Sequence, residues 1–168
     1  MGTVAEPLQS WIVVREAPDG ASLADALFRR RYRQPAPDFP YHVLAFWCDG
    51  ADEIPVCYVH FTALGSALLG GGACVDERVL RRMPVPARAA IRDAGGMYKY
   101  TLAWSLRHFA TRFGAIFGYC GDALAERIDL AVGFAKTQHP HLLVYWTRET
   151  DAAERQNLIA QAHALGPF

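Results

Sequence analysis

The chain has 168 residues, of which 52% are hydrophobic and 20% charged, a composition typical of a folded domain and not of a disordered segment. Seventeen basic and seventeen acidic side chains cancel, which argues against nucleic acid or an anionic membrane as the main partner. No apolar run is long enough to cross a bilayer, and the first residues lack a signal-peptide pattern. We therefore expect a cytoplasmic protein in which residues 1–168 form a single domain.

The N-terminal part predicts a strand, a helix and an extended linker. Residues 11–14 are apolar and strand-like. A helix is expected to follow, with Ser22 as its N-cap and Asp25 at the capping-box position. Arg29–Arg31 fall at the end of this helix, where cations stabilise the helix dipole or, alternatively, bind an anion. Three prolines then enforce an extended linker.

A block of strands comes next. Residues 42–47 and 56–64 read as strands, and Gly65-Ser66 is a two-residue hairpin turn into a third strand, residues 67–75. That third strand contains three consecutive glycines at 70–72. Because glycine weakens the interior of a strand, the run indicates a bulge, a sharp bend, or close approach of another backbone or a ligand.

Helices and strands alternate in the second half of the chain. A basic, proline-broken connection with a short helix following Pro86 comes first. The elements expected after it are a helix at 97–113, a strand at 115–119, a helix from Asp122 to Gly133, strands at 134–138 and 142–146, and a helix from Asp151 to Gly166. In the helix that begins at Asp122, the buried side is expected to consist of Leu124, Ile128 and Val132. The predicted class is α+β, as a three-layer α/β/α arrangement. Its mixed, mostly antiparallel twisted sheet has about six or seven strands flanked by helices.

A glycine-rich turn opens the helix at 97–113. Arg92 precedes the pair Gly95-Gly96, and Met97 begins the helix. A turn of this kind leaves backbone N–H groups pointing outward, and the helix dipole adds partial positive charge at the same place. The pattern is suited to a phosphate or pyrophosphate, although two glycines before a helix are also common in ordinary turns.

The order of elements and four local motifs resemble the GNAT superfamily of acyl-CoA-dependent N-acyltransferases. The glycines at 70–72 would suit the family's bulged fourth strand, which splays from the fifth. Arg92 and Gly95 match its pyrophosphate loop, Arg/Gln-x-x-Gly-x-Gly/Ala, with Met97 where a small residue is usual. The turn at Asp122 is similar to the family's Asn-x-x-Ala turn, and Gly133-Phe134 to its Gly-Phe pair.

This resemblance implies acetyl-CoA or another acyl-CoA as co-substrate. It also implies transfer of an acetyl or other short acyl group to an amine of a small-molecule or peptide acceptor, with a possible homodimer and no metal. The residues expected at the cofactor are the turn Arg92, Gly95, Gly96 and Met97, the backbone of Cys74 and Val75, and Asp122. The amide of Cys74 or Val75 is the candidate oxyanion donor.

Attack of an amine on a thioester needs a base for the ammonium and, in some cases, an acid for the departing thiolate. Glu77 and His60 are the candidate bases, and a surface glutamate and a packed strand histidine are the alternative readings. The family often uses a tyrosine four residues before the Gly133 position as the acid. This chain has Asp129 there, which at neutral pH donates a proton only if burial raises its pKa. Tyr119 is the candidate replacement.

Two other functions follow from these departures. A catalytically silent GNAT-like sensor or interaction module that binds CoA is favoured by Asp129. A small-ligand-binding protein unrelated to CoA is favoured if Met97 blocks the phosphate site.

His139 and His141 resemble a metal-binding pair, but no Asp, Glu or Cys lies close by in the sequence, and Pro140 at a strand entrance explains the segment. The four cysteines lack Cys-x-x-Cys spacing and read as buried free thiols: Cys48, Cys57, Cys74 and Cys120. Cys74 and Cys120 are candidate nucleophiles, but no neighbour in the sequence activates either thiol.

Overall fold

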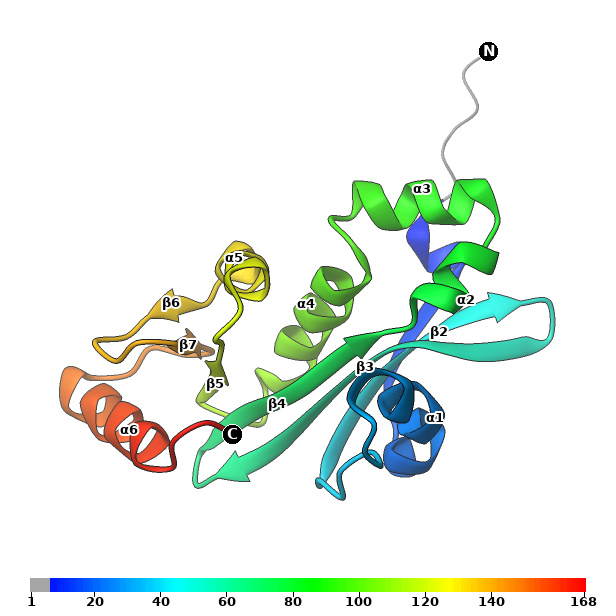
Figure 1. The fold of residues 1–168 in the computed structure, drawn as a ribbon. Coiled ribbons are helices and arrows are strands. Elements are labelled where there is room, and N and C mark those ends of the chain that lie inside the picture. The colour runs from blue at the N-terminus through cyan, green and yellow to red at the C-terminus, as the bar shows by residue number, and fades with distance from the viewer. Residues whose placement is uncertain (1–6) are drawn as a thin grey trace, which may run out of the picture. The chain divides into compact units, whose positions relative to one another are not determined.

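The computed structural model describes residues 7–168. Within them the chain forms seven strands and six α-helices. The strands make one sheet in the order β1-β2-β3-β4-β5-β7-β6, in which β4 and β5 run parallel (Figure 1). This confirms the predicted α+β class and the mixed, mostly antiparallel sheet. No helix in the described part of the chain is long and apolar enough to cross a membrane.

The elements follow one another from a short 3-10 turn to a final helix. Those of the first half are η1 (Leu8–Ser10), β1 (Ile12–Glu16), α1 (Gly20–Tyr32), β2 (Tyr41–Asp49), β3 (Asp52–Leu64), β4 (Ala67–Val75), α2 (Glu77–Arg82) and α3 (Val85–Asp93). Those of the second half are α4 (Met97–Phe109), β5 (Ala115–Tyr119), α5 (Ala123–Val132), β6 (Ala135–Lys136), β7 (Leu142–Trp146) and α6 (Ala152–Ala164).

The chain divides into two compact units. Of the described residues, unit 1 takes 7–59 and 73–101, and unit 2 takes 60–72 and 102–168. Each unit therefore draws on separated parts of the chain. The elements β3, β4 and α4 contribute residues to both units.

In unit 1, helices pack on both faces of the strands because side chains of β2 alternate. Leu44 and Phe46 face α1 in a cluster with Phe28 and Tyr58. On the other face, Trp47 packs in a cluster that also contains apolar residues of α2 and α3. The resulting core buries apolar surface on both sides of the strands.

The first helix begins earlier than predicted. α1 starts at Gly20, and its N-cap Asp19 makes no side-chain capping hydrogen bond. Asp25 therefore lies inside the helix, where it accepts from Arg29 Nε at 2.7 Å and from the N–H of Ala36 at 3.2 Å. The predicted cap at Ser22 is wrong because Gly20 already packs against His42, a contact that the local sequence does not reveal.

The basic connection after β4 is more ordered than predicted, since it forms two helices. Asp76 caps α2 by accepting from the N–H groups of Arg78 at 3.0 Å and Val79 at 3.4 Å. An extended residue, Met83, and the proline after it separate α2 from α3. The second helix, α3, begins one residue before Pro86, which occupies its first turn, where a missing N–H costs nothing.

In unit 2, α6 packs Leu158 and Ile159 against a core that includes Phe117 of β5 and Val144 of β7. The buried side of α5 differs from the prediction. Leu124 is 63% exposed, whereas Asp129 is 6% exposed. The helical phase therefore turns a carboxylate inward, which an amphipathic pattern alone would place at the surface.

A stability test follows from Asp76, whose side chain is 4% exposed and ion-paired with Arg30. Burial of Asp76 opposes its charged form, but the hydrogen bonds from Arg30 and from the N–H of Arg78 outweigh burial and hold its pKa below the usual value. Replacement Asp76→Ala should lower the free energy of unfolding by about 2 kcal/mol at pH 7, measured by urea denaturation.

Because the folded-state pKa of Asp76 is lowered, its stabilisation is present at neutral pH and disappears as pH falls below the ordinary range of aspartate. The difference between wild type and Asp76→Ala should therefore shrink at pH values near and below 4. The exposed N-cap of α6 is the matched control, and Asp151→Asn should change stability by less than about 0.5 kcal/mol. A difference for Asp76→Ala that persists unchanged in acid would contradict this account.

Candidate functional site

The parallel ladder between β4 and β5 ends at a pair of glycines. It runs from Ala67 opposite Ala115 to Gly70 opposite Gly118. β4 then continues through residues 71–75 without a partner in this register, whereas β5 ends one residue later. The ladder thus ends where the glycine run begins, with Tyr119 as the one remaining residue of β5, and the splay of β4 from β5 stays a prediction.

His60 of β3 supports this glycine run from inside unit 2. The N–H of Gly72 donates to His60 Nε2 at 2.8 Å, and His60 is 4% exposed. A Cβ atom on Gly71 would meet the same imidazole, with its Cδ2 at 2.5 Å, so only glycine fits there. Since Nε2 accepts a hydrogen bond, the ring is the neutral tautomer with the proton on Nδ1. This geometry favours a structural role for His60 over that of a base.

The end of β4 offers backbone groups on one edge. The N–H of Asp76 donates to Val56 O of β3 at 2.8 Å. Because successive N–H groups of a strand alternate sides, the N–H of Val75 points to the edge away from β3. The N–H of Cys74 points toward β3. Of the two candidate oxyanion donors, Val75 is therefore favoured, because its N–H lies on the edge of β4 that does not face β3.

The glycine turn before α4 closes the preceding helix. Gly95 and Gly96 have φ angles of 90° and 102°, and their N–H groups donate to Arg92 O and Ile91 O, both at 2.9 Å. This pattern is a helix C-cap of the Schellman type. It corrects the expectation that the amides of Gly95 and Gly96 point outward, because both already have acceptors.

The backbone N–H groups that could bind an anion are therefore those of the first turn of α4, and not those of Gly95 and Gly96. The first hydrogen bond along this helix is donated by the N–H of Tyr100 to Gly96 O at 3.1 Å. The N–H groups of Met97 and Lys99 precede it, at the positive end of the helix dipole. The side chain of Met97 is 3% exposed within the unit 1 core, so the thioether packs inward.

Lys99 is a residue that sequence reasoning missed. Its side chain folds back over the turn, since a Cβ on Gly95 would lie 2.7 Å from Lys99 Cδ and 3.2 Å from Nζ. A cation in the first turn of a helix opposes the macrodipole and is unfavourable unless an anion joins it. The sequence signal that could have identified Lys99 is a lysine in the first turn of a predicted helix.

The remaining candidates are distributed over both units. In unit 1, Glu77 and Arg92 are exposed side chains. In unit 2, Asp122 caps α5 by accepting from the N–H groups of Leu124 and Ala125, and the ring of Tyr119 packs against His141 and Phe168. The local structure accounts for Asp122 as a cap and for Tyr119 as a packed aromatic residue.

Asp129 is buried next to the end of the parallel ladder. Its Oδ2 lies 4.0 Å from the position that a Cβ on Gly118 would occupy, and Gly118 is the last β5 residue in register with β4. The carboxylate also helps to raise the pKa of the Cys120 thiol, for which burial is the main cause. A titratable group thus lies beside the glycine pair within unit 2.

Two buried cysteines, Cys57 and Cys74, are poor nucleophiles. All four cysteines are free, and burial raises the pKa of Cys57 and of Cys74 to about 12. A thiol with such a pKa holds its proton at neutral pH, which excludes a thiolate at either position. Among residues 7–168, no three His, Cys, Asp or Glu side chains are grouped so that they could hold a metal ion.

Solved structures share this fold at low sequence identity. The ribosomal-protein-S18-alanine N-acetyltransferase from Escherichia coli aligns with a TM-score of 0.55 and 9% identity, over 84% of this chain and 97% of that one. Aminoglycoside 6′-acetyltransferase type Ii aligns with a TM-score of 0.53 and 11% identity, over 83% and 99%. No protein-family model and no functionally curated protein matches the sequence. The chain therefore has the GNAT fold, as its motifs predicted.

His60 gives a test that separates support of the bulge from catalysis. Replacement His60→Leu leaves the Gly72 N–H buried without its acceptor and should lower the free energy of unfolding by about 2 kcal/mol in urea denaturation. Replacement His60→Gln supplies a side-chain oxygen as acceptor and should recover part of that loss.

If His60 has only a structural role, the acyl-transfer activity of the two variants should fall and recover in parallel with their free energies of unfolding. If His60→Gln restores stability but abolishes turnover, His60 acts as a proton acceptor and the structural assignment is wrong.

Proposed function

We propose that this chain transfers an acetyl or other short acyl group from acyl-CoA to an amine. The observation that carries the proposal is the end of the β4–β5 ladder at Gly70 and Gly118, in a fold shared with acetyltransferases. A strand that leaves its parallel neighbour presents unpaired backbone groups, to which the amide groups of a pantetheine arm can hydrogen-bond.

The diphosphate of CoA is assigned to unit 1, at the start of α4. The N–H groups of Met97 and Lys99 and the helix dipole favour an anion there. The ammonium of Lys99, folded over Gly95, supplies a full positive charge, and Arg92 lies exposed at the end of α3. An anion at this position would offset the unfavourable placement of Lys99 in the first turn.

The chemistry requires nucleophilic attack of a neutral amine on the thioester carbonyl. The N–H of Val75 is the proposed oxyanion donor. Glu77, exposed at the start of α2, is the proposed acceptor of the ammonium proton. For the departing thiolate, Asp129 and Tyr119 of unit 2 are the proposed proton donors, and Asp129 serves only in its neutral form.

A second function, a CoA-binding sensor without turnover, is favoured by Asp129 itself. An aspartate ionised at neutral pH accepts hydrogen bonds and donates none, so it cannot protonate a thiolate. The same fold would then bind CoA and release it unchanged.

CoA binding is tested by thermal shift, with a control that the chain itself offers. Acetyl-CoA at about one hundred times its dissociation constant should stabilise the protein by about 2.7 kcal/mol and raise the melting temperature by several degrees. Replacement Lys99→Gln should weaken binding about tenfold, about 1.4 kcal/mol, by removing a charge from the phosphate site. Lys136, the other lysine, lies exposed in β6, and Lys136→Gln should leave affinity unchanged.

Absence of any shift with millimolar acetyl-CoA would exclude both the transferase and the sensor. Equal weakening by the two lysine substitutions would place the diphosphate away from Gly95.

Turnover is tested by thiol release from acetyl-CoA with a panel of primary amines. The transferase should release CoA only when an amine is present. Replacement Asp129→Asn should lower kcat by tenfold or more if the neutral carboxyl is the acid, while the CoA-induced thermal shift is retained. Binding without amine-dependent thiol release in the wild type would favour the sensor.

A further inference from the structure

Unit 1 carries a concentration of positive charge, of which the proposed acyl transfer uses only Arg92. Two segments, residues 20–33 and 76–93, contain nine arginines and four acidic residues. All nine arginines are exposed, and together they are named the arginine surface: Arg29, Arg30, Arg31, Arg33, Arg78, Arg81, Arg82, Arg88 and Arg92. The net charge of zero for the whole chain conceals this distribution.

The arginines repeat at helical spacing on two helices. Positions 78 and 82 of α2 and positions 88 and 92 of α3 are each four residues apart, so each pair lies on one side of its helix. Like charges at this spacing destabilise a helix by roughly 0.2–0.5 kcal/mol per pair. Six of the nine arginines lie in the last turn of their helix, where the helix dipole favours a cation. An anionic ligand would relieve the repulsion within the pairs.

Few of these guanidinium groups are neutralised within the protein. Arg29 pairs with Asp25, Arg30 with Asp76, and Arg92 lies 3.8 Å from Asp93. Within residues 7–168, none of the other six arginines of the surface has a carboxylate within ion-pair distance. Their charge remains available to a partner.

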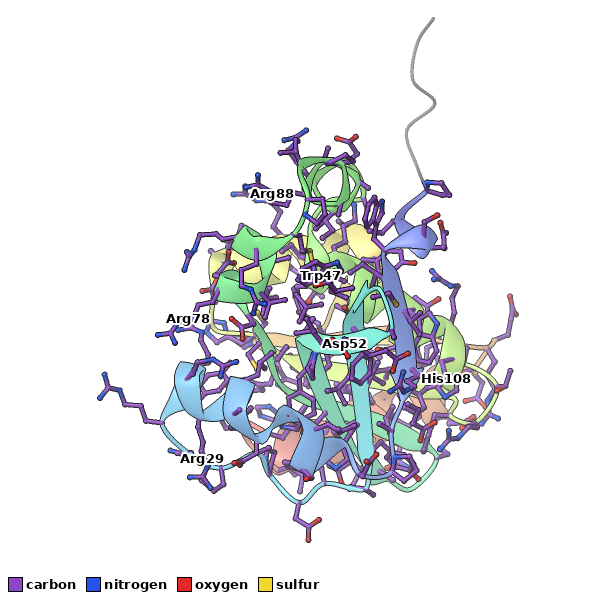
Figure 2. All side chains as sticks on the ribbon, turned by 90° about the vertical axis from the view of Figure 1, so that its right-hand side faces the viewer. Arg29, Trp47, Asp52, Arg78, Arg88 and His108 are labelled. Carbon is purple, nitrogen blue, oxygen red and sulfur yellow. The ribbon has the colours of Figure 1, made fainter. Side chains whose placement is uncertain are left out.

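Two contacts join the segments into one surface. The guanidinium of Arg30 binds Asp76, the N-cap of α2, and Tyr32 Oη donates to Ala73 O at 2.6 Å. The last turn of α1 is thereby fixed beside the start of α2. In Figure 2, Arg29, Arg78 and Arg88 all project toward the same side of unit 1.

We propose that the arginine surface binds the phosphate backbone of a structured RNA. Guanidinium groups match phosphate oxygens in a bidentate manner, and a series of them across three helices exceeds what one small anion needs. Residues 76–93 contain no Asn, Gln, Ser or Thr to read base edges. An arginine can read guanine in the major groove of duplex DNA, but the deep, narrow major groove of folded RNA excludes side chains, so there the arginines would contact the backbone and its shape.

A membrane fits this surface less well. An interfacial helix needs a continuous apolar side opposite its basic side. Here the exposed large apolar residues are scattered, with Leu23 and Tyr32 on α1 and Val85 on α3. The proposal does not rest on acyl transfer, since the surface would bind RNA whether or not the chain turns over acyl-CoA.

Fluorescence anisotropy with a labelled RNA hairpin tests the proposal on the full chain. The triple variant Arg81→Gln, Arg82→Gln, Arg88→Gln should raise the dissociation constant at least tenfold in low salt. It should also reduce the slope of log affinity against log salt by about 2 between about 50 and 200 mM. The matched control replaces three exposed unit 2 arginines by glutamine, at Arg107, Arg127 and Arg148, and should stay within twofold of wild type.

Three outcomes would overturn the proposal: no binding of the hairpin by the wild type in low salt, equal weakening by the two triple variants, or tighter binding to duplex DNA or phosphatidylserine vesicles than to the hairpin. If the arginine-surface triple variant does not melt cooperatively, the single variant Arg82→Gln replaces it. That variant should lower the salt slope by about 1, and an unchanged slope would equally overturn the proposal.

Discussion

The end of the β4–β5 ladder at Gly70 and Gly118 is the feature on which the proposed coenzyme site depends. Parallel strands gain their stability from an even ladder of hydrogen bonds, and a ladder that stops early leaves polar backbone groups to be satisfied in another way. Here His60 accepts the N–H of Gly72, and its ring occupies the space that a side chain at Gly71 would need. A buried imidazole and two glycines thus define the backbone of β4 just beyond the ladder, where the proposed acyl-CoA arm would bind.

Periodicity and local motifs predicted most of the fold because local interactions decide those elements. Asp122 and Asp151 cap their helices as expected, and Gly133 ends α5 in the left-handed conformation. The predictions that were wrong concern features that depend on contacts between residues distant in sequence. Gly20 extends α1 because it packs against His42, and the apolar pattern of α5 did not reveal that Asp129 lies inward.

For the candidate site, the sequence identified the glycine turn, but it did not reveal which acceptors the N–H groups of the turn bind. The residues Gly95 and Gly96 were expected to bind phosphate, yet their N–H groups cap α3, a helix that the proline-broken segment did not clearly predict. The fold of the Lys99 side chain over the turn becomes apparent only in the structure, although its charge in the first turn of the helix could be read from the sequence. The net charge is a similar case, because a sum of zero reveals neither the positions of the arginines nor that six of the nine have no carboxylate within ion-pair distance in the described part of the chain. The exclusion of nucleic acid from net charge alone therefore does not extend to the surface of unit 1.

The most direct measurement is a crystal structure of the protein grown with acetyl-CoA. The account predicts that the pantetheine arm hydrogen-bonds to the backbone of β4 after Gly70, with the thioester oxygen at the N–H of Val75 and the diphosphate at the start of α4 beside Lys99. A structure in which the ladder closes beyond Gly70, or in which the coenzyme binds without touching β4, would contradict it.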